Sequence, residues 1–334
     1  MDIRELIGQL YPADERAEIT VVKIQGDASN RQYFRVSGQH DTHIACIDPS
    51  FRGKTPDAYP FLAVGKLLAD HGIRVPGVLA CDSADGLLLL EDCGDRMLQD
   101  EAALLGAGAL AVLYRQVVDL LVEIQSIRPQ GASIPFSLSF DHEKLMFEFD
   151  FFIEHCLRGH FGGMIDEVSI NALRREFDAI SGLLVRPEHF VLNHRDFHSR
   201  NVMLFRDEPV VIDFQDARLG LPQYDAVSLL RDSYVCLDDE LVESLKAHHF
   251  SQLEKRGTMS MSFSEYLRYF DLMAFQRNIK AIGTFSYQVS VVGNRTFESS
   301  IAPTLAYLPA YIAAQPELAR AGRLLEPLIR TIAS

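Results

Sequence analysis

The periodicity of apolar residues changes near residue 93 from mainly β-type to mainly helical, and this change restricts the fold more than any other feature. Upstream, residues 19–91 contain short apolar runs such as "ITVVKI" and "LLLLE", separated by turn residues such as Pro76 and Gly86. Runs of this kind are typical of antiparallel strands. A helical pattern, "AYPFLAVGKLLADHG" at residues 58–72, interrupts them. We therefore expect a small β-rich lobe with one inserted helix.

Downstream of "EDCGD" most segments carry apolar residues at the spacing of an α-helix. The exception is residues 191–214, where "FVLN", "VMLF" and "PVVIDF" are short β-type runs. We predict an α+β protein, with a β-rich lobe over residues 1–93 and a larger, mainly α-helical lobe over residues 94–334. The expected helical segments are 97–127, 141–158, 166–185, 223–233, 238–255, 263–285 and 303–331.

Composition excludes several classes of function. A net charge of -14 argues against binding of nucleic acid, which needs clustered Lys and Arg. The longest nearly uncharged stretch, residues 102–114, is shorter than the roughly 20 apolar residues of a membrane-spanning helix, and the N-terminus lacks the apolar run of a signal peptide. Five scattered cysteines without a CxxC pair indicate reduced thiols. We expect a cytoplasmic protein, a monomer or weak dimer, without nucleic-acid or membrane partners.

The stretch "HRDFHSRN", residues 194–201, carries the strongest chemical signal. Its Asp196 and Asn201 have the spacing of H-R-D-x-x-x-x-N, and Asp213 ends the run "VVID" further on. Phosphoryl transfer needs a carboxylate that orients and deprotonates the acceptor hydroxyl, and oxygen ligands for Mg²⁺. Either fragment alone is ordinary, but together they follow the order found in kinases. We predict Asp196 as catalytic base, and Asn201 and Asp213 as Mg²⁺ ligands.

A loop for the phosphates of ATP is expected between the first two strands, where the sequence reads "QGDASNRQYFRV". Gly26, Ala28 and Ser29 are small, so that backbone amides and a hydroxyl can approach a phosphate closely. Arg31 and Arg35 add positive charge. An ordinary hairpin turn of small residues has the same pattern. The position of this loop ahead of the kinase-like motif favours a phosphate-binding role.

The third predicted strand, "HIACIDPS", lacks the lysine that binds phosphate in kinases. Either an arginine replaces this lysine, for which we favour Arg35, or the loop amides and Mg²⁺ hold the phosphates without it. The segment "LLLLEDCGD" fits a hinge between the lobes. There, backbone groups of Glu91 to Cys93 are expected to bond the adenine edge of ATP.

Five stretches together resemble the aminoglycoside phosphotransferase and choline kinase superfamily over almost the whole chain: "GDASNRQYFRV", "LLLLEDCG", "HRDFHSRNVML", "VVIDFQDARLGLPQYDAVSLLRDSYV" and "DLMAFQRNIKAIGTF". The "DAS.R.YFR" loop, the lysine-free strand and "DFQDA" look most like the bacterial anomeric kinases that phosphorylate N-acetylmuramate and N-acetylglucosamine in cell-wall recycling. The resemblance implies a protein-kinase-like bilobal fold with ATP in the cleft, and the roles given above to Asp196, Asn201 and Asp213. It also implies a phosphate loop made of Gly26, Asp27, Ala28, Ser29, Asn30 and Arg31.

The predicted function is that of an ATP- and Mg²⁺-dependent kinase acting on a hydroxyl of a small molecule, an amino sugar by resemblance. Kinases of an aminoglycoside, choline or another small alcohol remain as alternatives. The missing lysine also fits a nucleotide-binding pseudokinase that acts as a scaffold. A metal-dependent hydrolase built on His194, Asp196 and His198 lacks a further cluster to complete a two-metal site.

Residues for the acceptor are expected on the helices of the larger lobe and just after Asp213. Gln215 and Asp216 come just after Phe214, the residue that follows the predicted metal carboxylate, and by sequence alone they are better placed than the helix residues. The charge of Arg277 would suit the lactyl carboxylate of N-acetylmuramate, whereas clustered carboxylates would suit a cationic aminoglycoside. Solvated helix faces and salt bridges explain such residues equally well. The polar candidates on two otherwise apolar helices are Glu148, Asp150, Glu154, Asp271, Gln276, Arg277 and Lys280.

Overall fold

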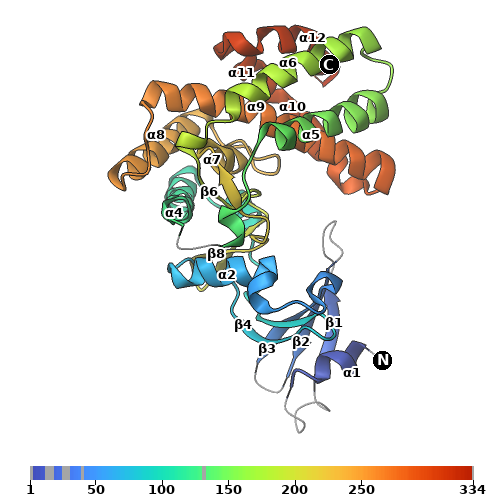
Figure 1. Ribbon diagram of the computed structural model, residues 1–334, viewed down its shortest axis with the longest axis vertical. Helices are drawn as coiled ribbons and strands as arrows, with labels where there is room; N and C mark the ends of the chain where they lie inside the picture. Colours follow the sequence, from blue (N-terminus) through green and yellow to red (C-terminus); the bar gives the residue numbers. More distant parts are fainter. Residues whose placement is uncertain (1–2, 12–18, 25–30, 39–40, 130–132, 333–334) are drawn as a thin grey trace. The chain divides into compact units, whose positions relative to one another are not determined.

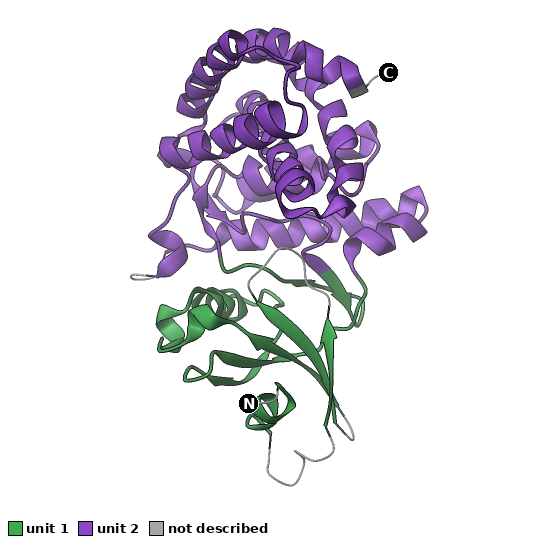
Figure 2. Ribbon diagram, turned by 90° about the vertical axis from the view of Figure 1, so that its right-hand side faces the viewer, with its two compact units in different colours: residues 1–96, 203–215 green, residues 97–202, 216–334 purple. Residues whose placement is uncertain are grey.

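The chain divides into two compact units, which Figure 2 colours separately. The first consists of residues 1–96 and 203–215, the second of residues 97–202 and 216–334. The computed structural model describes residues 3–11, 19–24, 31–38, 41–129 and 133–332. The larger sheet lies in the first unit and most helices in the second, which confirms the predicted α+β class with a β-rich N-terminal part and a mainly helical remainder.

The first unit is built on an antiparallel sheet in the order β1-β2-β3-β5-β4. Side chains alternate between the two faces of a strand, so Phe34 and Val36 of β2 enter the core with Ala45 and Leu89, while Arg35 points to the other face. The strands are β1 (Thr20–Ile24), β2 (Gln32–Ser37), β3 (Thr42–Ile47), β4 (Val78–Asp82) and β5 (Leu87–Glu91). The short helix α1 (Ile3–Gly8) adds Ile7 to the same core.

The inserted helix of this unit is α2 (Pro60–Asp70), between β3 and β4. Pro60 occupies its first turn, where the missing N–H costs no hydrogen bond. The ring of Phe214 stacks on Phe61 at a centroid distance of 5.0 Å. A Cβ atom at Gly65 would lie 3.1 Å from the Phe214 ring, so the small residue allows this close contact. Phe214 is thereby packed into the first unit.

A hairpin from later in the chain completes the first unit. Its strands are β7 (Val202–Phe205) and β8 (Glu208–Val211), and the turn residues Arg206 and Asp207 have φ angles of 53° and 64°. Two left-handed residues form the type I′ turn that matches the twist of paired strands. The Leu204 N–H donates to the Arg96 carbonyl at 2.9 Å, and the Val211 N–H donates to the Arg74 carbonyl at 2.9 Å. These bonds tie the hairpin to the N-terminal segment.

The second unit is organised around α9 (Phe263–Tyr287), which packs against α5, α7, α10 and α11 (Figure 1). At Gly283 a Cβ atom would lie 2.8 Å from the Phe152 Cα atom, so glycine is required for the close approach of α5. The strands β6 (Val191–Asn193) and β9 (Arg218–Gly220) pair antiparallel. The other helices are α3 (Leu98–Leu104), α4 (Ala107–Ser126), α5 (His142–Phe152), α6 (Glu167–Leu184), α7 (Gln223–Leu230), α8 (Asp239–Lys255), α10 (Glu298–Ala306), α11 (Leu308–Ala314) and α12 (Ala319–Ile332).

Two of the predicted helical segments are interrupted. Within 97–127, Leu105 adopts extended backbone angles and Gly106 begins a new helix as its N-cap. Within 303–331, Gln315 is extended because the proline after it disfavours the helical conformation. None of the helices in the described part of the chain is long and apolar enough to cross a membrane.

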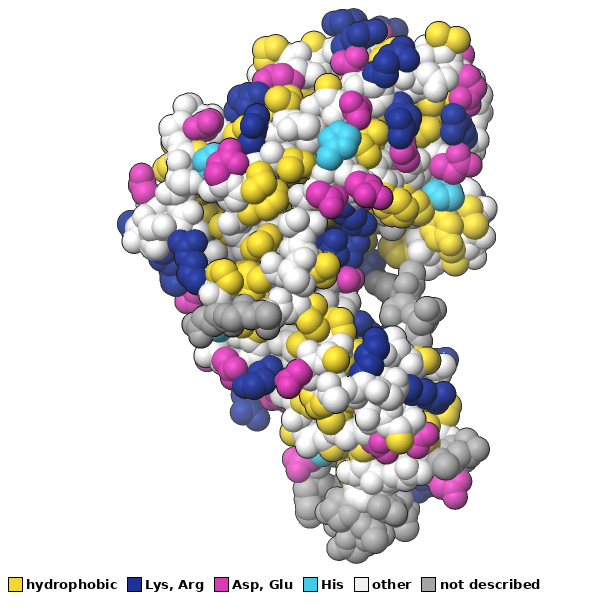
Figure 3. Space-filling model, in the orientation of Figure 1, with side chains coloured by type: hydrophobic (Ala, Val, Ile, Leu, Met, Phe, Trp, Pro, Cys, Tyr) yellow, Lys and Arg dark blue, Asp and Glu magenta, His cyan; other side chains and the backbone are white. Residues whose placement is uncertain are grey.

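Charged side chains of both signs are interspersed on the face of the helical unit drawn in Figure 3. This arrangement differs from the clustered Lys and Arg of a surface that binds a polyanion.

Candidate active site

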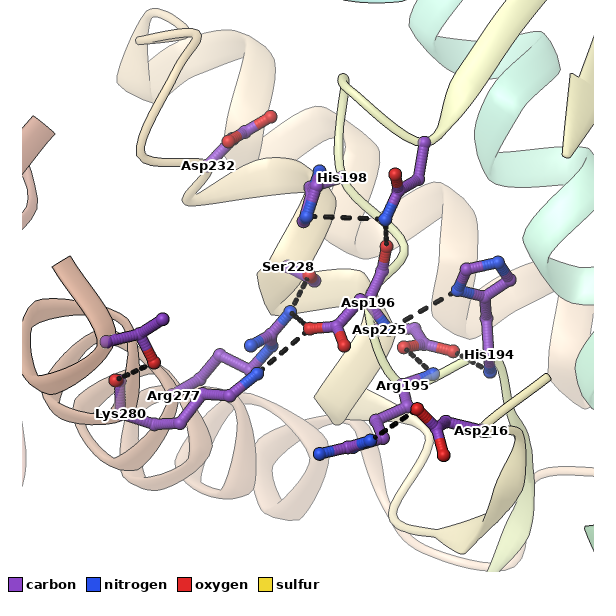
Figure 4. Close-up of polar contacts among 12 residues, drawn as sticks. His194, Arg195, Asp196, His198, Asp216, Asp225, Ser228, Asp232, Arg277 and Lys280 are labelled. Atoms are coloured by element: carbon purple, nitrogen blue, oxygen red, sulfur yellow. Dashed lines mark hydrogen bonds and ion pairs between the residues drawn. The ribbon is translucent and has the colours of Figure 1, made fainter. Parts of the chain in front are cut away.

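The loop between β6 and β7 carries the "HRDFHSRN" motif, and buried carboxylates from outside the loop hold it (Figure 4). Asp225 of α7 accepts the N–H of His194 at 2.5 Å and the N–H of Arg195 at 3.0 Å. Burial raises the pKa of Asp225 to about 7. Arg195 has a φ of 87°, a left-handed conformation that costs a non-glycine residue about 1–3 kcal/mol. Asp232 accepts the Ser199 N–H at 2.9 Å, so the loop is fixed at both ends.

Asp196 lies within a cluster of positive charges. Its Oδ1 accepts hydrogen bonds from Nη2 of Arg277 at 3.1 Å and from Nζ of Lys280 at 2.9 Å. Burial by itself would raise the pKa of this carboxyl, but the charges of Lys280, Arg277 and Arg195 hold the pKa well below its usual range. The carboxylate is therefore ionised at neutral pH, with 26% of its side chain exposed.

The two cations that bind Asp196 come from one face of α9, at positions i and i+3. Arg277 also donates to the Ser228 hydroxyl, and its guanidinium lies 4.8 Å from the centroid of the Tyr224 ring. Burial and repulsion from Arg277 lower the pKa of Lys280. The Arg277 side chain is 7% exposed and that of Lys280 17%, so Lys280 is the more accessible of the two.

A pocket of about 110 Å³ adjoins Asp196 and Lys280. Its wall includes the rings of Tyr234 and Phe285, whose centroids lie 5.9 Å apart, and the amide of Asn278. Figure 4 shows Arg277 and Lys280 both directed toward Asp196. Apolar rings beside a few convergent polar groups are typical of small-molecule sites.

Asn201, the predicted metal ligand of this loop, uses its amide nitrogen within the site. Nδ2 donates to the backbone oxygen of Asp196 at 2.9 Å and lies 3.4 Å from Nε2 of His198. Burial lowers the pKa of His198 to about 3, so its imidazole is neutral and can accept this bond. The amide oxygen is the atom that Asn201 has to offer to a metal ion, and oxygen is the donor that Mg²⁺ prefers.

Asp213, the second predicted metal ligand, follows β8 in the first unit. Its φ is 63°, and left-handed non-glycine residues are concentrated at functional sites. Half of its side chain, 48%, is exposed, and Gln215 donates to its Oδ1 at 2.9 Å. The described residues hold no group of three His, Cys, Asp or Glu side chains that could bind a metal ion. Magnesium that binds with phosphates usually takes one or two protein carboxylates, which fits the donors predicted here.

The predicted nucleotide residues lie in the first unit. Gly26, Asp27, Ala28, Ser29 and Asn30 are outside the described residues. Arg31 follows them, and its guanidinium bonds Asp48 and Gln215. Arg35 bonds Asp92 at 2.7 Å and Asp95 at 2.8 Å, two carboxylates that follow β5.

The predicted hinge residues come at the end of β5. The Glu91 side chain is paired with Arg74 at 2.5 Å, and the backbone N–H of Glu91 donates to the Gly77 carbonyl at 2.8 Å. Cys93 is buried, with 4% of its surface exposed. The assignment of these residues to adenine binding stays a prediction.

The motif region matches a known protein family: residues 20–259 match the family model of the phosphotransferase enzyme family. The chain belongs to this family. An N-acetylmuramate/N-acetylglucosamine kinase of Pseudomonas aeruginosa is 31% identical, over 96% of this chain and 90% of the relative. The enzyme of the same name from Neisseria meningitidis is also 31% identical, over 91% and 89%. This phosphotransferase is accordingly a small-molecule kinase with a hydroxyl group as acceptor.

Solved structures of other kinases share the fold of this phosphotransferase. An ethanolamine kinase of Plasmodium vivax has a TM-score of 0.66 and 13% identity, over 92% of this chain and 87% of that chain. A choline kinase of Cryptosporidium parvum has a TM-score of 0.65 and 14% identity, over 99% of both chains. An aminoglycoside phosphotransferase in complex with streptomycin and ATP has a TM-score of 0.58 and 15% identity, over 93% and 98%. These likenesses confirm the predicted kinase-like, bilobal fold.

The predicted acceptor residues of the phosphotransferase do not all come together. Arg277 lines the pocket beside Asp196. Glu148 is buried in α5 and accepts a hydrogen bond from Gln276 at 2.9 Å. Gln215 bonds Asp213 in the first unit, and Asp216 pairs with Arg195 at 2.9 Å in the second. Arg277 alone among these four is part of the pocket wall.

The sequence prediction did not rank two residues that the phosphotransferase structure brings forward. Lys280 was one polar residue among several on a helix, yet it contacts Asp196 directly. Its spacing from Arg277 was the available signal, because residues at i and i+3 share a helix face. Asp225 lies in the "PQYDAV" segment, and nothing local indicates that its carboxylate holds the backbone of a loop 30 residues upstream.

Proposed function

We propose that this phosphotransferase transfers the γ-phosphoryl group of ATP, in a Mg²⁺-dependent reaction, to a hydroxyl of an amino sugar of the N-acetylmuramate/N-acetylglucosamine type. The curated relatives carry this activity in their names and align with nearly the whole chain. A solved structure with the same fold contains ATP. The observation that carries the proposal is the ionised Asp196, in a braced loop beside a small pocket with basic side chains.

In the proposed reaction the acceptor hydroxyl donates a hydrogen bond to Asp196 while its oxygen attacks the γ-phosphorus. The new O–P bond forms as the bond from phosphorus to the β,γ-bridging oxygen breaks, ADP leaves, and the hydroxyl proton passes to Asp196. Mg²⁺, held through Asn201 and Asp213, would neutralise charge on the phosphate oxygens. Because the transition state is loose, the main task of Asp196 is orientation, for which a carboxylate of low pKa is suited.

The charges in the pocket indicate the class of acceptor. The pocket is lined by three cations, Arg231, Arg277 and Lys280, and by two carboxyl groups, those of Asp196 and Asp232, so positive charge is in excess. A cationic acceptor such as choline or an aminoglycoside meets repulsion there, whereas a neutral sugar does not. The lactyl carboxylate of N-acetylmuramate would be attracted to Lys280, the more exposed of the two cations. The ring of Tyr234 offers an apolar surface to the sugar.

A panel of acceptors tests this assignment. The purified protein is incubated with ATP and Mg²⁺ and with N-acetylmuramate, N-acetylglucosamine, an aminoglycoside or choline, and products are identified by mass spectrometry. We expect phosphate on the two amino sugars. Phosphorylation of choline or the aminoglycoside in place of the sugars would overturn the acceptor class. Nucleotide binding without turnover on any acceptor would favour a pseudokinase scaffold.

A comparison of the two sugars tests the contribution of Lys280. Lys280→Ala should raise KM for N-acetylmuramate about tenfold more than KM for N-acetylglucosamine, because only the former carries a carboxylate. An equal increase in KM for both sugars would mean that Lys280 acts only through its contact with Asp196 and does not bind the lactyl carboxylate.

We also propose a cytoplasmic enzyme that works as a monomer or weak dimer. All five cysteines lie in the described residues and are free thiols, as is usual in a reducing compartment. Cell fractionation and sedimentation at several concentrations are the measurements. Recovery from the periplasm, or a tight oligomer at low concentration, would contradict this assignment.

A further inference from the structure

A buried ion pair in the first unit lies beside the predicted metal carboxylate. The third strand of the sheet, β3, has no lysine, and an arginine from another element is one of the two replacements that the sequence leaves open. Gln32 pairs with Ile47 in the β2–β3 register, and continuing this register by one residue sets Arg31 opposite Asp48. Nε of Arg31 bonds Oδ2 of Asp48 at 3.0 Å.

Arg31 is directed toward Asp213 by this pairing and by Gln215. Its Nη1 donates to Oε1 of Gln215 at 3.0 Å and lies 3.9 Å from Oδ1 of Asp213. The guanidinium is 5.6 Å from the centroid of the Phe61 ring, and the side chain is 13% exposed. Packing on several sides therefore fixes the cation at one place in the unit.

Asp48 is itself rigidly held. Oδ1 accepts the Ser50 N–H at 2.8 Å, and Oδ2 accepts the Tyr59 hydroxyl at 2.5 Å. Its backbone N–H donates to the Gly86 carbonyl at 2.8 Å. Burial would raise the pKa of this carboxyl, but its hydrogen bonds, the largest from Tyr59, hold the pKa at about 2. A buried ion pair contributes little stability compared with apolar packing, so stability alone does not account for it.

We propose that Arg31 and Asp48 take the place of the strand lysine and its carboxylate partner. Arg31 is the residue that contacts a phosphate of the nucleotide, and Asp48, with the Tyr59 hydroxyl, is the positioning residue. A guanidinium has five N–H donors in a planar fork, so it can bond a phosphate and keep the bond to Asp48. Arg35, which we first favoured for this role, is instead bound to Asp92 and Asp95. This inference rests on the proposed use of a nucleotide.

Calorimetry without any acceptor separates phosphate contact from a structural role. ADP with Mg²⁺ and adenosine are titrated into the wild-type protein and into Arg31→Ala, Arg31→Lys and the matched control Arg35→Ala. We expect Arg31→Ala to weaken ADP binding about 10- to 100-fold and to leave adenosine binding unchanged. Arg31→Lys should recover part of the ADP affinity, and Arg35→Ala should leave the ratio of ADP to adenosine affinity at its wild-type value.

The contribution of Asp48 is measured by a double-mutant cycle. Asp48→Asn should weaken ADP binding in the wild-type background and have little further effect in the Arg31→Ala background, because its role acts through Arg31. Tyr59→Phe, which removes one donor to Asp48, should show the same dependence on Arg31. Arg31→Ala alone leaves Asp48 as an unpaired buried charge and could fail to fold for that reason. In that case the ADP affinity of the double variant, which lacks this charge, is compared with that of Asp48→Asn.

The possible results separate this inference from the proposed function. A wild-type protein that binds neither ADP nor ATP overturns both. A wild-type protein that binds ADP, with an Arg31→Ala variant of equal ADP affinity, overturns the inference alone. An equal loss of ADP and adenosine affinity in Arg31→Ala also overturns it, because the residue is then structural.

Discussion

At the scale of single residues, the proposed chemistry depends on the pairing of Asp196 with Arg277 and Lys280. The two cations keep the carboxylate ionised and limit its movement. An amide at this position would keep the shape of the side chain and lose its charge. The consequence for catalysis can be measured separately from nucleotide binding.

We expect Asp196→Asn to lower kcat by about 10²- to 10⁴-fold, because the acceptor hydroxyl loses the group that orients it and takes its proton. ADP affinity, measured by calorimetry, should stay near the wild-type value. Asp150→Asn is a matched control, because Asp150 lies on the surface of α5 and pairs with Arg174. A fully active Asp196→Asn protein would remove Asp196 from the mechanism.

The lowered pKa of Lys280 predicts an effect of pH. Lys280 is charged below its pKa and loses its charge as the pH rises through that value, which lies below that of an ordinary lysine. Activity should therefore fall on the alkaline side as Lys280 becomes neutral. Lys280→Arg keeps its charge at high pH, so the alkaline limb of the profile of kcat/KM should move to higher pH. Superimposable alkaline limbs for the two proteins would mean that another group titrates.

The sequence predicts the loop of Asp196 as the site of the reaction, because the predicted base and one predicted metal ligand lie within eight consecutive residues. It did not identify the partners of Asp196, which lie 81 and 84 residues downstream. No local pattern joins positions that meet through the packing of α9. The Arg31–Asp48 pair could not be predicted for a related reason, because it depends on the register between β2 and β3.

At the scale of elements, the contact of α5 with α9 sets a strict limit on side-chain size. Gly283 faces the Phe152 backbone, and backbone cannot move aside as the end of a side chain can. By contrast, a Cβ atom at Gly182, on the exposed face of α6, meets nothing within 4 Å. The two glycines lie in helices, so the same substitution tests packing against helix propensity.

Gly283→Ala should lower the free energy of unfolding by about 1–3 kcal/mol, because the added methyl group overlaps the neighbouring helix. Gly182→Ala should raise it by up to about 1 kcal/mol, because alanine favours the helix. Urea unfolding followed by circular dichroism measures both changes. A rise in the free energy of unfolding for both variants would show that the α5–α9 contact relaxes without cost.

Among the elements, the strands β1 to β5 and the helix between them follow from local patterns, because each run shows its own periodicity and ends at turn residues. The strand β9 was not predicted, since its three residues pair with β6 across the intervening residues 194–217. The interruptions at Gly106 and Gln315 were also not predicted. The helical spacing of apolar residues continues through both positions, but the helical backbone is interrupted there.

At the scale of the whole molecule, the first unit is discontinuous in sequence. Residues 203–215 belong to it although more than a hundred residues of the second unit precede them in the chain. The hairpin bonds Arg74 and Arg96, and Phe214 packs on Phe61. Local periodicity predicts the strands of this segment, but their membership of the first unit depends on contacts distant in sequence.

A fragment of residues 1–96 should therefore not form a stable unit by itself. It lacks Phe214 and would expose the apolar face of α2, so we expect binding of the dye ANS and no cooperative thermal transition. The same fragment joined by a flexible linker to residues 203–215 should melt cooperatively. Cooperative melting of the short fragment, at the temperature of the joined one, would contradict the role of the hairpin.

The divided first unit also has a consequence for synthesis on the ribosome. Domains generally fold as units during translation, the N-terminal one first. Here the N-terminal sheet emerges early but cannot acquire Phe214 and the hairpin until residue 215 has left the exit tunnel. The nascent sheet therefore stays partly uncovered while residues 97–202 of the second unit are translated. During this interval we expect chaperones to bind the exposed apolar surface. A chain that is translated slowly, or that ends before residue 215, would stay incompletely folded and be degraded.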